Sequence, residues 1–169
     1  SSDVCSSDLN FDFPPTNEAY KALFRAIDTM TSSIIWGLVL GAITGFGAAI
    51  TGLERSRLFY PLILVAIALF YVAFATTTGD MAAITDEAGI ALLFVMVAVA
   101  GYRWGPLFVA FGAVAHGLFD LVHTESTGQH GAPDWWPAFC GAYDIMIAIA
   151  IARWAAALRH ATQIGRAHV

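Results

Sequence analysis

Four residues near the end of the chain could carry chemistry, because ionisable side chains recur there at helical spacing in apolar surroundings. His116, Asp120 and His123 form the pattern His-x-x-x-Asp-x-x-His. At about 100° per residue, these side chains lie within about 60° of one another on one helix face. Asp144 lies in the next apolar stretch, four residues after Cys140. Imidazoles and carboxylates in such a setting suit either a divalent metal or a proton relay.

The metal interpretation is the preferred one, because two imidazoles and two carboxylates can hold zinc or another divalent transition metal. The predicted metal ligands are His116, Asp120, His123 and Asp144. The candidate catalytic carboxylates are Asp144 and Glu87. A bound metal with an open position would make water a nucleophile near neutral pH, as in a membrane-embedded hydrolase. Since about 10 Å of helix axis separates the two histidines, one metal needs convergent rotamers, or Asp120 orients one histidine.

Two other classes of function use the same residues. Histidine beside buried carboxylates can relay protons, which predicts a proton-coupled transporter or sensor. Alternatively, polar side chains can hold helices together by hydrogen bonds, as in an accessory or assembly subunit. Whether the chain is an enzyme therefore stays open.

The remaining reactive side chains are weaker candidates. Cys140 is expected to be a small packing residue, since one credible cysteine makes neither a disulfide nor a cysteine cluster. Glu125, His130 and Asp134 fall in a polar connection and are expected to be solvated.

The elements that position these residues are predicted to be membrane-spanning helices. The chain is 58% hydrophobic and only 12% charged, far from the soluble globular norm of about a quarter charged. Apolar stretches approach the roughly 20 residues that cross a bilayer. They run from 33 to 52, 58 to 77, 83 to 102, 105 to 123 and 137 to 157. The predicted fold is an all-α polytopic bundle of about five transmembrane helices, a single domain over residues 10–163.

Basic residues predict the orientation. Arginines occur in the first and third connections and near the end of the fifth helix: Arg55, Arg57, Arg103, Arg153 and Arg159. The second and fourth connections have no lysine or arginine, whereas Lys21 and Arg25, before the first helix, lie against the pattern. The positive-inside rule makes the first and third connections and the end of the fifth helix cytoplasmic, so that the visible N-terminus is external and the C-terminus cytoplasmic. Counting residues from the outer helix ends then puts the ionisable residues about 6 to 12 Å deep. Each buried charge costs about 2.5 to 3.5 kcal/mol, so we expect the residues to converge on one interior site in the outer half.

The first part of the chain carries two further patterns. Residues 16–30 predict either a short amphipathic helix on the outer interface or an extension of the first helix. Gly37, Gly41 and Gly45 recur every four residues and predict a close helix–helix contact, with another helix or a second copy of the chain. The expected partners are the lipid bilayer and such a helix; the net charge of −5 argues against nucleic acid.

The two ends look foreign to the protein. Residues 3–8 can be written in DNA as GAC GTG TGC TCT TCC GAT, and its reverse complement encodes residues 164–169. This string resembles a sequencing-library adapter. We therefore exclude residues 1–9 and 164–169 as non-native ends and expect that the natural chain extends beyond both.

The last third of the chain resembles a group of uncharacterised small bacterial inner-membrane proteins. The similarity rests on the run from His116 to His123, on Trp136-Pro137, and on Cys140-Gly-Ala-Tyr-Asp144. The resemblance implies a multi-pass protein of the bacterial inner (cytoplasmic) membrane and no particular activity.

Overall fold

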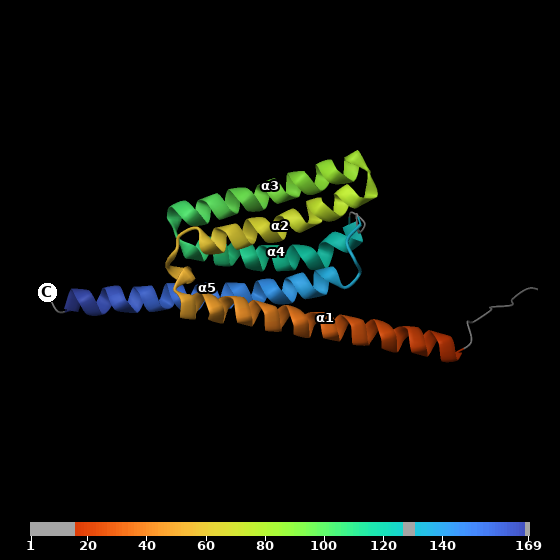
Figure 1. Ribbon diagram of the computed structural model, residues 1–169, viewed down its shortest axis with the longest axis horizontal. Coiled ribbons are helices and arrows are strands. Elements are labelled where there is room, and N and C mark those ends of the chain that lie inside the picture. Colours follow the sequence, from red (N-terminus) through yellow and green to blue (C-terminus); the bar gives the residue numbers. More distant parts are fainter. Residues whose placement is uncertain (1–15, 127–130, 168–169) are drawn as a thin grey trace, which may run out of the picture.

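The computed structural model of the protein describes residues 16–126 and 131–167. Within them it has five α-helices, one short 3-10 turn and no strand. The elements are α1 (Thr16–Thr51), η1 (Leu53–Arg55), α2 (Phe59–Thr78), α3 (Met81–Trp104), α4 (Pro106–Ser126) and α5 (Trp136–Ala167). Each helix is long and apolar enough to cross a membrane, which confirms the expected all-helical, multi-pass fold (Figure 1).

The helices end at residues whose local chemistry stops a helix. Gly52 and Gly79 adopt left-handed backbone angles, with φ of 75° and 71°, after α1 and α2. Asp80 caps α3, because its Oδ1 accepts a 2.9 Å hydrogen bond from a first-turn backbone N–H. Gly105 and Pro106 make the tight turn between α3 and α4, with proline at the first helical position. Short turns of this kind keep α2, α3 and α4 antiparallel.

The first helix is longer than a membrane crossing requires. α1 has 36 residues, a length of about 54 Å against about 30 Å of hydrocarbon. Residues 16–30 continue this helix without a break, so the extension is the arrangement that the structure adopts. Figure 1 shows this part running beyond the bundle. The side chains of residues 17–32 are all exposed, and Ser33 is the first buried residue of the helix.

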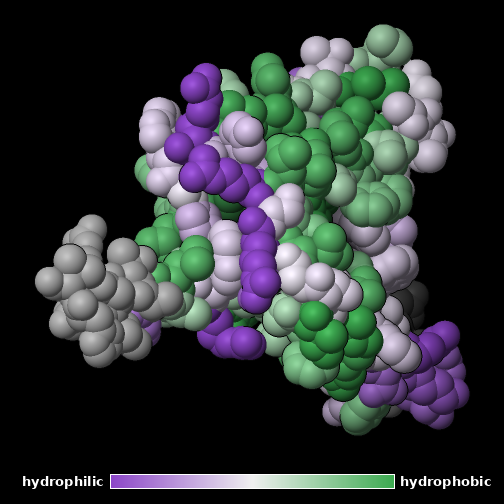
Figure 2. Space-filling view, turned by 60° about the vertical axis from the view of Figure 1, so that its left-hand side comes forward, coloured by the Kyte–Doolittle hydropathy of each residue, from purple (hydrophilic) through white to green (hydrophobic). Residues whose placement is uncertain are grey.

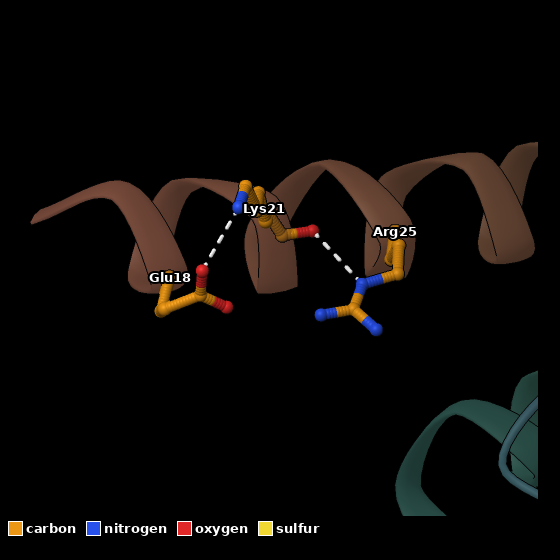
Figure 3. A network of polar contacts seen from close by, with 3 residues as sticks. All are labelled: Glu18, Lys21 and Arg25. Atoms are coloured by element: carbon orange, nitrogen blue, oxygen red, sulfur yellow. Dashed lines mark hydrogen bonds and ion pairs between the residues drawn. The ribbon is translucent and has the colours of Figure 1, made fainter. Parts of the chain in front are cut away.

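Charged groups on this extension are satisfied locally. The ammonium group of Lys21 lies 2.9 Å from a carboxylate oxygen of Glu18, one turn before it (Figure 3). The Nε of Arg25 donates to the backbone carbonyl of Lys21 at 3.3 Å. Exposed contacts such as these contribute little to stability.

α5 joins α1 to the rest of the bundle. It packs against α1 on one side and α4 on another, while α3 packs against α4 and α2 (Figure 1). The glycine face of α1 makes the first of these contacts. Side chains at Gly41 and Gly45 would place a Cβ 2.7 Å from the Cβ atoms of Met146 and Ala150, respectively. The predicted close contact is therefore made with α5 of the same chain.

Burial separates a lipid-facing surface from a partly polar interior. Large hydrophobic side chains are exposed on all five helices, as expected where lipid replaces water. The buried polar or charged residues of the described ranges are Ser33, Glu87, His116, Asp120, His123 and Asp144. Five of these six are the ionisable residues that the sequence singled out.

Candidate metal centre

Two glycines allow α4 and α5 to approach closely where the ionisable residues lie. A Cβ at Gly117 would lie 3.3 Å from the Cβ of Asp144 and 3.3 Å from the backbone oxygen of Gly141. Gly117 follows His116 in α4, and Gly141 follows Cys140 in α5. The close backbone contact brings the side chains of the two helices within reach of each other.

Four side chains meet at this contact. His116 and Asp120 come from α4, one helical turn apart, and Cys140 and Asp144 come from α5, also one turn apart. Each offers a ligand atom, and these atoms all lie within 4.8 Å of one another. All four residues are buried, with exposed fractions from 0% to 2%. We call this group the four-residue centre.

His116 faces both carboxylates of the centre. Its Nδ1 forms a 2.9 Å hydrogen bond with Oδ2 of Asp144 and lies 3.6 Å from Oδ2 of Asp120. A tetrahedral zinc ion with bonds of about 2.0 to 2.3 Å has ligand atoms about 3.3 to 3.8 Å apart. The Asp120 separation already falls in that range. The Asp144 separation would widen once a metal replaces the proton between the two groups.

The carboxylates of the centre have few hydrogen bonds. Within the described part of the chain, both oxygens of Asp120 and Oδ1 of Asp144 lack a hydrogen bond of normal geometry. Tyr71 from α2 and Cys140 are the polar neighbours of Asp120. Burying an ion costs several kcal/mol unless its charge is neutralised and its lone pairs are bonded. A proton or a cation must therefore accompany these carboxylates.

A second buried pair lies beside the centre. Nε2 of His123 lies 2.8 Å from Oε1 of Glu87, and both side chains are buried. The sequence predicted His123 as a metal ligand and Glu87 as a catalytic carboxylate, whereas the structure brings them together and leaves them out of the four-residue centre. The reason is the rise of the helix. His123 lies seven residues, about 10 Å, further along α4 than His116, and at that height the same helix face meets Glu87 of α3.

Aromatic rings connect the centre and the second pair. The ring of Tyr71 lies 4.9 Å from that of His123 and 6.2 Å from that of His116, measured between centroids. Phe119 lies between the same two histidines, with centroid distances of 4.5 and 6.2 Å. Phe94 from α3 packs edge-on against His116 at 4.7 Å. These rings exclude water and restrict the imidazole rotamers.

Two members of this region were not singled out as ligands from the sequence. Cys140 was expected to be a packing residue, and it does pack in a buried apolar cluster, but its position one turn before Asp144 also places it on the same face of α5. Tyr71 offered no pattern, since a tyrosine in an apolar helix is common. Of the loop candidates, Asp134 is exposed, while the side chains of Glu125 and His130 lie outside the described residues.

An apolar groove on the lipid-facing side reaches the centre. It has a volume of about 350 Å³ and is formed by residues of α1, α2 and α5. Cys140 lines it, together with Ile67, Phe70, Trp136 and Tyr143. Cys140 therefore belongs to both the groove and the four-residue centre, and the groove is the side from which an apolar molecule could approach.

Comparison with known proteins gives no further assignment. No protein-family model, no curated protein and no solved structure matches the chain. Function must therefore be inferred from the site itself.

Proposed function

We propose that this multi-pass membrane protein binds a divalent transition metal in the four-residue centre. The observation that carries the proposal is the convergence of four metal-ligating side chains, from two helices, within 4.8 Å in a fully buried place. Three of the four carboxylate oxygens there have no hydrogen bond of normal geometry in the described chain. A cation would supply both the missing contacts and the missing positive charge.

The donor set favours zinc. One imidazole nitrogen, one thiolate and two carboxylates combine the ligand types that Zn²⁺ accepts. Mg²⁺ and Ca²⁺ prefer six or more oxygen ligands, which this dry interior does not offer. A thiolate also favours a softer metal over Mn²⁺.

The reaction that we propose for the metal is hydrolysis of an apolar molecule that enters from the bilayer. A zinc ion supplies a Lewis acid that makes water a nucleophile near neutral pH. His116, Asp120 and Cys140 would hold the metal, which is the three-ligand pattern of catalytic zinc sites. Asp144 would give up its hydrogen bond to Nδ1 of His116, the nitrogen that faces the metal position, and would accept the proton from the attacking water. The groove beside Cys140 supports this proposal, because it gives a lipid-soluble substrate access.

A second candidate function is proton coupling, and a separate observation favours it. The Glu87–His123 pair lies next to Tyr71, whose ring contacts both histidines. Ionisable groups from α3, α4 and α5 are therefore buried in two pairs on either side of one tyrosine ring. Such an arrangement could carry protons through the outer half of the bundle. In that case a change in external pH would drive flux in proteoliposomes, and the Glu87→Gln variant would abolish it.

Cobalt substitution tests the metal proposal and its ligand set together. Co²⁺ bound by a thiolate and three further ligands gives a sulfur-to-cobalt charge-transfer band and visible bands of a tetrahedral site. We expect both with the wild type, and Cys140→Ser should lose only the charge-transfer band. Absence of tetrahedral bands at saturating Co²⁺ would contradict the proposal. Hydrolysis is then assayed separately with a fluorogenic phospholipid and with a lipophilic peptide, so that a metal without activity removes only the hydrolase assignment.

A further inference from the structure

A second cavity lies at the other end of α4, where α2 and α4 begin and α3 ends. Its volume is about 480 Å³, within the range of about 300 to 1,000 Å³ typical of small-molecule sites. Gly101 and Val109 form its buried floor, and Trp104 and Trp154 line it. Figure 2 brings this end of the molecule forward and shows hydrophilic side chains gathered across it, bordered by hydrophobic surface.

Basic side chains surround this cavity. Arg55, Arg57 and Arg103 line it, from the connection before α2 and from the last turn of α3. Within the described residues, no ion pair involves any of the three. Two further charged side chains interact electrostatically with Tyr60, a tyrosine of the cavity wall: one acid, Glu54, and a fourth arginine, Arg153. Cationic groups thus outnumber the one acid, and the cavity attracts anions.

A buried hydroxyl in the cavity wall lacks a partner. Tyr60 lines the cavity and is 2% exposed, and its hydroxyl has no hydrogen-bond partner among the described residues. A buried donor without an acceptor costs about 1 to 3 kcal/mol, so such donors are uncommon and indicate an absent ligand or water. The arginines and this hydroxyl together offer the donors that a phosphate group accepts.

We propose that this cavity binds a phosphate-bearing anion, the head group of an anionic phospholipid. The helices that form it cross the membrane, so the cavity lies at the depth of lipid head groups on the arginine-rich side. Trp104 and Trp154 are residues of the kind that occupies that depth. The proposal is independent of the metal centre, which lies further along α4.

Native mass spectrometry of the detergent-purified protein tests the proposal, with phosphatidylglycerol and phosphatidylcholine offered in equal amounts. We expect selective retention of phosphatidylglycerol. Each arginine near a membrane surface contributes about fivefold to the binding of an anionic lipid, so the Arg55→Gln, Arg103→Gln double variant should bind about 25-fold more weakly. Arg159→Gln is the matched control, because Arg159 is an exposed arginine of the same end outside the cavity.

The Tyr60→Phe variant separates a loss of lipid binding from a loss of folding. It removes only the hydroxyl, so the melting temperature should stay level or rise while retention of phosphatidylglycerol falls.

Inorganic phosphate distinguishes the source of the anion. If millimolar phosphate binds the wild type, is lost in the double variant, and no lipid preference exists, the cavity takes a free phosphate. Equal retention of both lipids together with no binding of phosphate would overturn the proposal.

Discussion

The imidazole of His116 lies between carboxylates from two helices, and this determines how the four-residue centre should respond to substitution. Asp144 bonds it at 2.9 Å and Asp120 lies 3.6 Å away, with all three side chains at most 1% exposed. In this dry place each charge is costly unless a proton or metal balances it. Stability and metal affinity should therefore change in opposite directions when a carboxylate is neutralised.

Asp120→Asn tests this opposition. The amide keeps the shape of the side chain and removes a buried charge, so the metal-free protein should melt at a higher temperature than the wild type. The same change removes a metal ligand, so zinc should no longer raise the melting temperature. Thermal unfolding in detergent, with zinc and with a chelator, measures both effects. A variant that is less stable in both conditions would indicate that Asp120 only holds helices together.

Asp144→Asn tests the carboxylate beside the metal position. Groups next to the metal ligands typically contribute about 10- to 100-fold to metal affinity, and the charge of Asp144 would help to balance that of the cation. We expect a loss of that size, measured by competition with a zinc-binding dye. An unchanged affinity would mean that Asp144 does not serve the metal.

The Glu87–His123 pair should couple α3 to α4 energetically. Interhelical polar contacts in membranes contribute about 0.6 kcal/mol on average and up to about 1.7 kcal/mol. Because this pair is buried, a double-mutant cycle with Glu87→Gln and His123→Ala should give a coupling energy near the upper value. The cycle is measured by unfolding in detergent with chelator present. A coupling energy near zero would contradict the pairing seen in the structure.

The residue scale also shows where sequence reasoning was limited. His116, Asp120 and Asp144 could be singled out because charges in apolar helices are costly and therefore informative. Cys140 could not be ranked as a ligand, since buried cysteine is an ordinary packing residue. His123 shares a helix face with His116, but a single helix does not reveal which neighbour each turn contacts. Only the packing of α3 and α5 against α4 separates the two histidines.

At the scale of helices, glycines determine which helices meet. The glycine face of α1 packs on α5, and Gly117 and Gly141 bring α4 and α5 together at the centre. The spacing of the α1 glycines predicted a close contact but not its partner, because small residues at every fourth position suit any helix. Whether residues 16–30 form a separate interfacial helix or continue α1 was also open from sequence, because an amphipathic pattern fits both arrangements.

Gly41→Ala and Gly47→Ala form a matched pair on α1. A Cβ at Gly41 would lie 2.7 Å from the Cβ of Met146 and 2.9 Å from the backbone oxygen of Tyr143, whereas a Cβ at Gly47 meets nothing within 4 Å. We expect Gly41→Ala to lower the melting temperature. Gly47→Ala should leave it level or raise it, because alanine favours helix by about 1 kcal/mol. Equal effects of the two changes would contradict the α1–α5 contact.

Gly117→Ala tests whether the distance between α4 and α5 determines metal binding. The new methyl would press on the Gly141 backbone oxygen and on Asp144 at 3.3 Å, and a backbone cannot rotate away as a side chain can. We expect weaker zinc affinity than in the Gly89→Ala control, whose Cβ meets nothing within 4 Å. Identical affinities would show that the centre tolerates a wider helix spacing.

At the scale of the whole molecule, the arginines predict a fixed orientation in the membrane. The connections before α2 and between α3 and α4 lie at one end of the bundle, towards which α5 also runs (Figure 1). We therefore propose that this end is cytoplasmic. A green fluorescent protein fused after α5 should fluoresce, and alkaline phosphatase at the same place should be inactive. The reverse result would reverse the proposed orientation and place the cavity near Tyr60 on the outer side.

The number of helices could be predicted at this scale because five apolar stretches of membrane-crossing length leave little choice. The arrangement of those helices could not, because lipid-facing and buried apolar residues look alike in sequence. Exposed leucines and phenylalanines on every helix illustrate this, since burial in the bundle and contact with lipid favour the same residues.

Metal content tests the central claim most directly. The detergent-purified protein, handled without chelators, is analysed by elemental mass spectrometry beside three variants: His116→Ala, Cys140→Ser and, as control, His123→Ala. We predict close to one zinc per chain in the wild type and in His123→Ala, with loss of zinc in His116→Ala and a reduced zinc content in Cys140→Ser. Failure of the wild type to retain a transition metal after incubation with zinc would contradict the account, as would equal zinc content in His116→Ala and the wild type.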